Sequence, residues 1–143
     1  MSRIGLIFAL HAALEGLLGL GLLIAPERFE PVLPLADPTA VLLARGYGAA
    51  VLGPAVASIL AFNLPDMLPC KRALATGFMV FHAAVAFLFF QARKHGSLEY
   101  SLATTSMITH MLFLGGFYVW CKVTEGQVKS FTKQQRNAEK RQQ

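Results

Sequence analysis

The chain has 143 residues, of which 55% are hydrophobic and only 15% are charged. Soluble domains carry about 25% charged residues, so this composition speaks against a water-soluble fold and predicts a single membrane domain. The net charge of +5 arises mainly after Cys121, where six of the thirteen Lys and Arg residues lie. Basic residues beside an apolar span suit an anionic membrane surface, and they do not favour a nucleic-acid partner.

Four apolar runs are long enough to cross a bilayer, which takes about 20 residues. They cover about residues 4–24, 39–62, 73–92 and 101–121. His11 and Glu15 interrupt the first run, which is therefore predicted to be a retained helix and not a signal peptide. Because backbone polar groups in lipid must be satisfied within the segment, all four runs are expected to be helices. The predicted fold is an all-α bundle of four transmembrane helices over residues 1–121.

The segment Ala25–Pro38 between the first two runs contains four prolines. Proline removes backbone donors, so we expect an irregular segment, which is either a plain connector or a lid over a site on that side. Residues 122–143 are polar and basic. With few apolar residues to bury, they are expected to form a disordered tail or a loose surface helix.

The basic residues also predict an orientation. One side of the membrane would hold Arg3, Lys71, Arg72 and the six basic residues of the tail, against Arg28, Arg93 and Lys94 on the other side. The side richer in Lys and Arg is normally cytoplasmic. We therefore expect both termini in the cytoplasm. Cys70 and Cys121 would lie at that edge, where thiols stay reduced.

Each predicted span carries one ionisable residue near the middle of the membrane or at moderate depth: Glu15, Arg45, His82 and His110. At 1.5 Å per residue, Glu15 lies about 16 Å into the first helix, and His11 lies one turn away on the same face. Such groups cost at least about 2.5–3.5 kcal/mol in a span, so they are either functional or neutralised by partners. We expect an ion pair between Glu15 and Arg45, with the histidines nearby.

Two interpretations of these polar residues stay open. They form either hydrogen bonds that hold the helices together or a ligand-binding, proton-transfer or catalytic site. In the second interpretation Glu15, His82 and His110 are the catalytic candidates, and Arg45 and His11 are the ligand-binding candidates. A metal site is not expected, because His11 and Glu15 are the only pair with a plausible ligand spacing on one helix. No cofactor is predicted.

Small residues in the second span, Gly46, Ala49, Ala50, Gly53 and Ala57, predict a close helix–helix contact. Pro54 within the same span predicts a kink.

Some residues resemble those of known membrane proteins. The run Ala44-Arg45-Gly46-Tyr47-Gly48, with His82 in the third span, resembles the small four-helix ergosterol-biosynthesis scaffold proteins of the endoplasmic reticulum. The Gly-rich first helix ending in Ala25-Pro26 is similar to that of bacterial DoxX-like small membrane proteins. The first resemblance implies an accessory protein that gathers sterol enzymes. Glu15 in the first helix is also similar in position to the glutamate of small multidrug transporters.

Three functions therefore remain open. The first is an accessory or scaffold protein of the endoplasmic reticulum or another internal membrane. It would function in lipid or sterol metabolism, alone or as a homo-oligomer. It would contact membrane lipids and other membrane proteins. The second is a membrane-embedded isomerase, cyclase or hydrolase that acts on a hydrophobic small molecule, a lipid or terpenoid, by acid–base chemistry. The third is a small proton-coupled transporter.

Overall fold

The computed structural model describes residues 5–30, 33 and 35–141. Within them it contains four α-helices, α1 (Leu6–Ile24), α2 (Pro38–Phe62), α3 (Pro69–His95) and α4 (Tyr100–Lys140), and one 3₁₀ turn, η2 (Pro26–Phe29). Each α-helix is long and apolar enough to cross a membrane. The predicted all-α fold is confirmed, and so is the prediction of four helices with the length and composition of membrane spans. Arg3 and Ile4, which the sequence analysis assigned to the cytoplasmic edge and the first span, lie outside the described residues.

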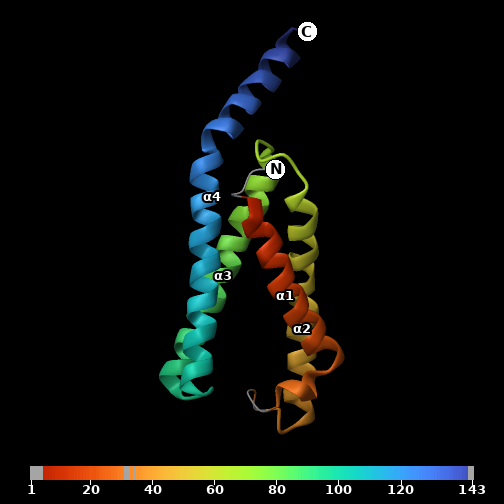
Figure 1. Cartoon of the computed structure of the whole chain (residues 1–143), viewed down its shortest axis with the longest axis vertical. Coiled ribbons are helices and arrows are strands. Elements are labelled where there is room, and N and C mark those ends of the chain that lie inside the picture. Colours follow the sequence, from red (N-terminus) through yellow and green to blue (C-terminus); the bar gives the residue numbers. More distant parts are fainter. Residues whose placement is uncertain (1–4, 31–32, 34, 142–143) are drawn as a thin grey trace.

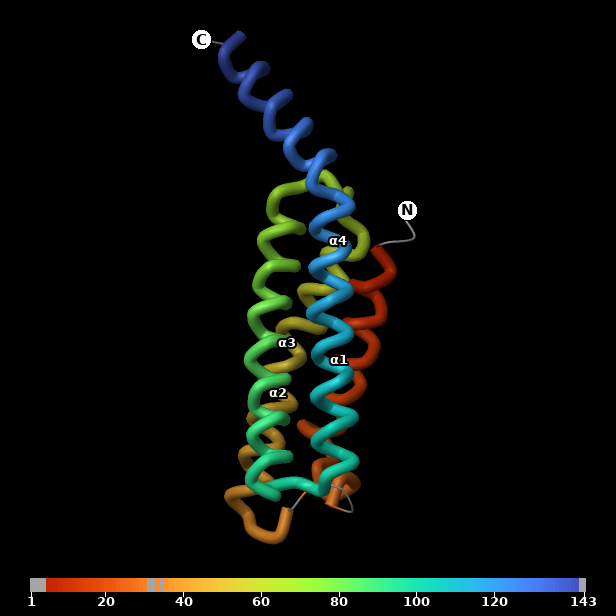
Figure 2. Tube along the Cα trace, turned by 90° about the vertical axis from the view of Figure 1, so that its left-hand side faces the viewer, coloured from red at the N-terminus to blue at the C-terminus, as the bar shows by residue number. Residues whose placement is uncertain are grey.

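The helices form two antiparallel pairs. α1 lies along α2, and α3 lies along α4. Figure 1 shows that the two pairs meet near the start of α1 and diverge toward the opposite end, where α1 and α3 end. Figure 2 shows α3 and α4 side by side in front of the other pair. The start of α1, the α2–α3 connection and the far part of α4 thus share one end of the molecule. Which side of a membrane this end faces stays a prediction.

Two glycines allow α1 and α2 to touch. A Cβ atom on Gly48 would lie 2.7 Å from the carbonyl oxygen of Gly19, and one on Gly19 would lie 2.9 Å from the carbonyl oxygen of Gly48. These distances are shorter than any real Cβ contact, so the two backbones meet where neither residue has a side chain. Close approach of this kind is how small residues join membrane helices.

Most of the predicted stripe of small residues on α2 lies outside the contact surface, although Ala57 packs against the aromatic core. Gly46 and Gly53 have open space where a Cβ would be, and Ala49 and Ala50 are exposed. At about 100° per residue, Gly46, Ala50 and Gly53 lie on the face of α2 opposite Gly48, and Ala49 lies at the side of the helix. The contact with α1 instead uses residues buried at helical spacing, namely Gly48, Val51, Ala55 and Ser58.

An aromatic core joins the pairs at the end where they meet. The rings of Phe8, Phe117 and Trp120 pack edge to face, with centroids 5.1–5.2 Å from Phe8. Lys71 is also buried here, with its ammonium 4.9 Å from the centroid of Phe8. It donates hydrogen bonds to the Asp66 carboxylate and the Leu64 carbonyl, both at 2.8 Å. The lysine predicted to mark the membrane edge therefore also fixes the α2–α3 connection.

The diverging end has well-defined helix termini. Asp37 caps α2 by accepting hydrogen bonds from the backbone N–H groups of Ala40 and Thr39, and these bonds lower the pKa of its carboxyl. Glu99 caps α4 in the same way. α3 ends at Gly96, whose φ of 67° lies in the left-handed region that favours glycine.

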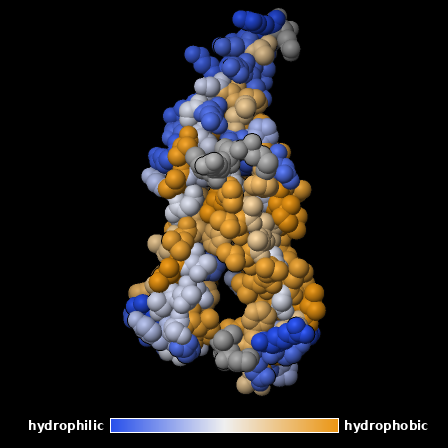
Figure 3. Space-filling view, in the orientation of Figure 1, coloured by the Kyte–Doolittle hydropathy of each residue, from blue (hydrophilic) through white to orange (hydrophobic). Residues whose placement is uncertain are grey.

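α4 continues well past its predicted end at residue 121. It runs to Lys140, so the structure makes this stretch helical where the sequence analysis expected disorder or a loose helix. Thr124 and Val128 are still buried, which explains why the helix does not stop at Lys122. Beyond them the helix projects from the bundle and is hydrophilic (Figures 1 and 3).

The middle of the molecule is apolar outside as well as inside. Leu17, Leu43, Val80 and Leu112 are each exposed by 67–72%. Figure 3 shows apolar residues over much of the visible face between hydrophilic ends. A surface of this kind is costly in water and stable in lipid, which supports an integral membrane protein.

Candidate functional site

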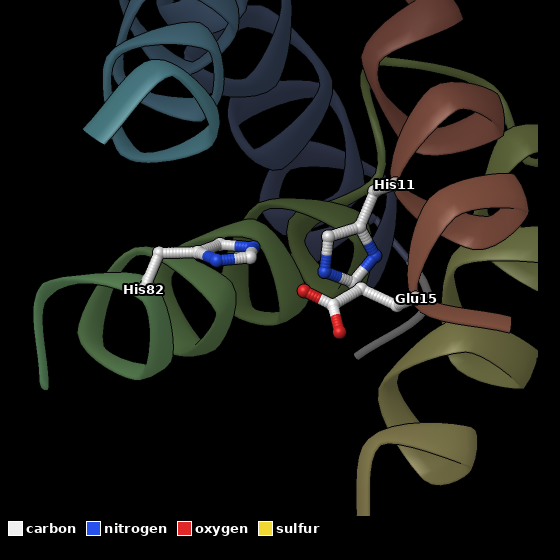
Figure 4. A group of neighbouring side chains, drawn as sticks. All are labelled: His11, Glu15 and His82. Atoms are coloured by element: carbon white, nitrogen blue, oxygen red, sulfur yellow. The ribbon is translucent and has the colours of Figure 1, made fainter. Parts of the chain in front are cut away.

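Four ionisable side chains meet at the centre of the bundle. α1 contributes His11 and Glu15 one turn apart, α3 contributes His82, and α4 contributes His110. All four are buried, with exposed fractions between 0% and 6%. Figure 4 shows His11 and Glu15 pointing from α1 toward His82 on the other helical pair. The structure therefore brings together four of the five predicted site residues.

Hydrogen bonds from neighbouring helices orient the rings of these histidines. His11 Nδ1 lies 2.7 Å from the hydroxyl oxygen of Ser58 on α2. His82 Nδ1 and His110 Nδ1 share a hydrogen bond of 2.8 Å. His110 Nδ1 also lies 3.9 Å from Glu15 Oε1. One hydrogen bond thus joins α1 to α2, and a second set of polar contacts joins α1, α4 and α3, as the hypothesis of interhelical hydrogen bonds requires.

Aromatic rings fix the imidazoles from the sides. His11 stacks on Phe78 with the ring centroids 4.6 Å apart, and His82 stacks on Phe113 at 5.0 Å. His110 stacks on Phe89 at 5.7 Å. Rings packed in this manner have little freedom to rotate. The cluster is therefore a preorganised set of polar atoms within an apolar shell.

Several polar atoms of the cluster have no hydrogen-bond partner in the part of the chain that the structure describes. They are His11 Nε2, Glu15 Oε2 and His82 Nε2. Buried polar atoms are normally satisfied, and interhelical hydrogen bonding alone accounts for only part of this cluster. One ligand atom from each of these three residues lies within 4.8 Å of the others. The arrangement leaves three polar atoms to interact with something other than the described chain.

A cavity of about 570 Å³ lies between the two helical pairs beside this cluster. Glu15 and His110 are its ionisable lining residues, and its walls are mainly leucine and phenylalanine side chains. Tyr47, Thr105, Ser106 and Thr109 add hydroxyl groups. Figure 3 shows the surface hollowed between the diverging pairs. Apolar walls with a few polar groups are typical of sites for small hydrophobic molecules.

The proline-rich segment covers part of this cavity. Phe29 and Leu33 line it, and the ring of Phe29 lies against Gly21, where a Cβ would be only 2.9 Å from it. These contacts are what the lid hypothesis requires, in contrast to a plain connector. Pro31, Val32 and Pro34 of the same segment lie outside the described residues.

The predicted ion pair between Glu15 and Arg45 is wrong. Arg45 is exposed and lines a separate shallow depression together with Asp37 and Val41. Side chains two positions apart in an α-helix point in directions that differ by about 200° around the helix axis. Tyr47 lines the cavity, so Arg45 must face away from it. Among the described residues, the basic group near Glu15 is His110, whose Nδ1 lies 3.9 Å from Glu15 Oε1 and forms an ion pair only when the ring is protonated.

Two residues of the site were missed by the sequence analysis. Ser58 supports His11, and the hydroxyl of Tyr47 is buried beside the cavity without a partner among the described residues. Neither side chain is charged at neutral pH, so the cost of burying a charge gave no signal for them. The depth of a residue in the membrane could be counted along each helix in the sequence. The direction in which its side chain points around the helix axis could not.

Comparisons with protein-family models, with curated proteins and with solved structures found no match for this chain.

Proposed function

We propose that the protein binds one lipid-like molecule in the cavity between its helical pairs and exchanges protons with it through Glu15 and His110. The cavity carries this proposal: about 570 Å³ of mostly apolar space with these two ionisable groups in its wall. A molecule with an apolar body and one polar group would match that distribution. The predicted class of a lipid or terpenoid substrate fits such a shape.

The positions of the groups support proton transfer. Glu15 and His110 both line the cavity, and Glu15 Oε1 lies 3.9 Å from the His110 ring, so one polar group of a bound molecule can approach both side chains. Proton transfer by a positioned side chain contributes about 10²–10⁴-fold to a rate. An isomerisation in which one group removes a proton and the other returns one needs no further reactant. His82 reaches the cavity only through its hydrogen bond with His110, so its role would be to orient that ring.

The binding part is tested by filling the cavity. Ala44→Phe places a ring in the cavity wall, and Ala50→Phe places the same ring on the outward face of the same helix. Native mass spectrometry of the purified proteins should find a lipid-like molecule retained by the wild type and by Ala50→Phe but not by Ala44→Phe. Equal retention in all three would contradict binding in this cavity.

The proton-transfer part is tested with heavy water. The protein is incubated with a membrane lipid extract in D₂O, and the lipids are examined for deuterium at carbon. Labelling by the wild type that is lost in His110→Gln is expected. If a lipid is retained but no deuterium enters it, the protein binds lipid without this chemistry.

A scaffold protein is the second candidate, and the projecting part of α4 favours it. This part is helical, basic and mostly exposed, which suits contact with an anionic membrane surface or a partner protein. Truncation after Val128 would then release co-purifying membrane proteins while leaving the cavity and its retained lipid unchanged. Location in the endoplasmic reticulum is part of this second proposal.

A further inference from the structure

Behind the cavity lies a group of buried polar side chains that the lipid-binding proposal does not explain. His11 and His82 do not line the cavity, yet both are fully buried, and each has one ring nitrogen without a partner among the described residues. Glu15 Oε2 is in the same condition. Two imidazoles and one carboxylate in a protein interior are a set of donors that divalent transition metals prefer.

The hydrogen bonds are compatible with the tautomers that a metal needs. When His11 donates from Nδ1 to the Ser58 oxygen, its Nε2 carries a lone pair. When His82 donates from Nδ1 to His110 Nδ1, its Nε2 does the same. Metal-binding histidines almost always donate their other ring N–H to such a supporting group. Both candidate ligands therefore have the support that is typical of a metal site.

The distances are close to those that one ion requires. The three ligand atoms lie within 4.8 Å of one another. Ligands of a tetrahedral zinc ion lie about 3.4 Å apart, because zinc–ligand bonds measure about 2.0–2.2 Å. Closure by roughly 1 Å is within the range of small side-chain rotations. Figure 4 shows the three side chains converging from the two helical pairs.

The negative charge of the buried Glu15 carboxylate also favours a metal ion. Glu15 is 3% exposed, and a carboxylate at such a position is strongly unfavourable unless a positive charge neutralises it. His110 is 3.9 Å away but carries a charge only when protonated, and its Nδ1 then cannot accept the hydrogen bond from His82. Arg45, expected as its partner, faces away. A divalent ion would neutralise Glu15 and satisfy all three unpartnered atoms at once.

We propose that His11, Glu15 and His82 bind one divalent first-row transition-metal ion, such as zinc or ferrous iron. Three protein ligands leave at least one coordination position for water or a substrate group, as in catalytic metal sites. With the ion bound, Glu15 would be a ligand and His110 would be the remaining proton-transfer group at the cavity. The site does not depend on lipid binding, and the two proposals can fail separately.

The first experiment measures metal content. Protein without a histidine tag is stripped with a chelator, reloaded with Zn²⁺ and analysed by mass spectrometry for bound metal. About one zinc per chain is expected, with affinity lowered roughly 100-fold or more in His11→Gln and His82→Gln. His95→Gln is the matched control, because His95 is exposed at the end of α3. Zinc binding that is absent, or unchanged in both ligand variants, would overturn the proposal.

A second measurement distinguishes the loss of a metal ligand from misfolding of the variant. His82→Cys, made with Cys70→Ser and Cys121→Ala, replaces an imidazole with a thiolate ligand. After loading with Co²⁺, a sulfur-to-cobalt charge-transfer band is expected if residue 82 binds the metal, and its absence in the folded protein would contradict this. Ala44→Phe should keep its metal while losing lipid, which separates this site from the lipid-binding proposal.

Discussion

At the scale of single residues, the support behind His11 is the most informative detail. Ser58 is fully buried and lies 2.7 Å from His11 Nδ1. Ser58 is not among the residues that line the cavity, so we expect its contribution to be the orientation of the His11 ring. A residue in this role affects metal affinity without touching the ion.

Ser58→Ala is therefore expected to weaken Zn²⁺ binding by about 10–100-fold, the range for loss of a supporting hydrogen bond. Ser58→Thr retains a hydroxyl and should restore most of the affinity, whereas Ser130→Ala, on the exposed part of α4, should have no effect. Competition titration with a zinc-sensitive dye measures all three. If Ser58→Ala and Ser130→Ala bind zinc equally well, the hydrogen bond has no role in the site.

Sequence reasoning located most of this cluster and missed some of it for a definite reason. Depth in a membrane follows from counting residues along a helix, which placed Glu15, His82 and His110 at one level. Direction around the helix depends on its contacts with neighbours. That is why Arg45 was assigned to the cluster and Ser58 was not.

At the scale of elements, the crossing of α1 and α2 depends on the absence of a single methyl group. Gly48→Ala would place a Cβ 2.7 Å from both the Gly19 oxygen and the Leu23 nitrogen. Backbone atoms cannot move aside as a side-chain tip can, so the helices must separate. We expect a loss of about 1–3 kcal/mol in stability, the usual cost of overpacking.

Gly53→Ala is the matched control on the same helix, since nothing lies within 4 Å of its added Cβ. It should be neutral or slightly stabilising, because alanine is the better helix former. Thermal unfolding in detergent compares the two variants. Equal midpoints would mean that α1 and α2 do not approach as closely as the structure has them.

The same helix shows what a composition pattern can and cannot predict. The small residues of α2 predicted a close contact, and such a contact exists, but on another face. Small residues occur on both sides of α2, and the partner α1 determines which side is used. Gly46 and Gly53 are left facing outward, where an added Cβ would meet nothing within 4 Å.

At the scale of the whole molecule, the start of α1 and the far part of α4 share one end (Figure 1). Their charge predicts that this end is cytoplasmic. Cys70 is exposed there, so in sealed right-side-out membranes it should resist a membrane-impermeant maleimide and react after permeabilisation. Ser97→Cys with Cys70→Ser, at the opposite end, should show the reverse pattern. If the two cysteines exchange behaviours, the protein is inserted the other way.

The divergence of the two helical pairs also determines from which phase a molecule enters the cavity. The cavity lies between the diverging pairs, and its walls are mainly leucine and phenylalanine side chains. We therefore expect a bound molecule to exchange with the hydrocarbon phase and not with water. Its occupancy would then depend on its mole fraction in the bilayer and be insensitive to the volume of buffer. A weakly bound but abundant lipid would fill the cavity as effectively as a tightly bound scarce one, and dilution with inert lipid would empty it.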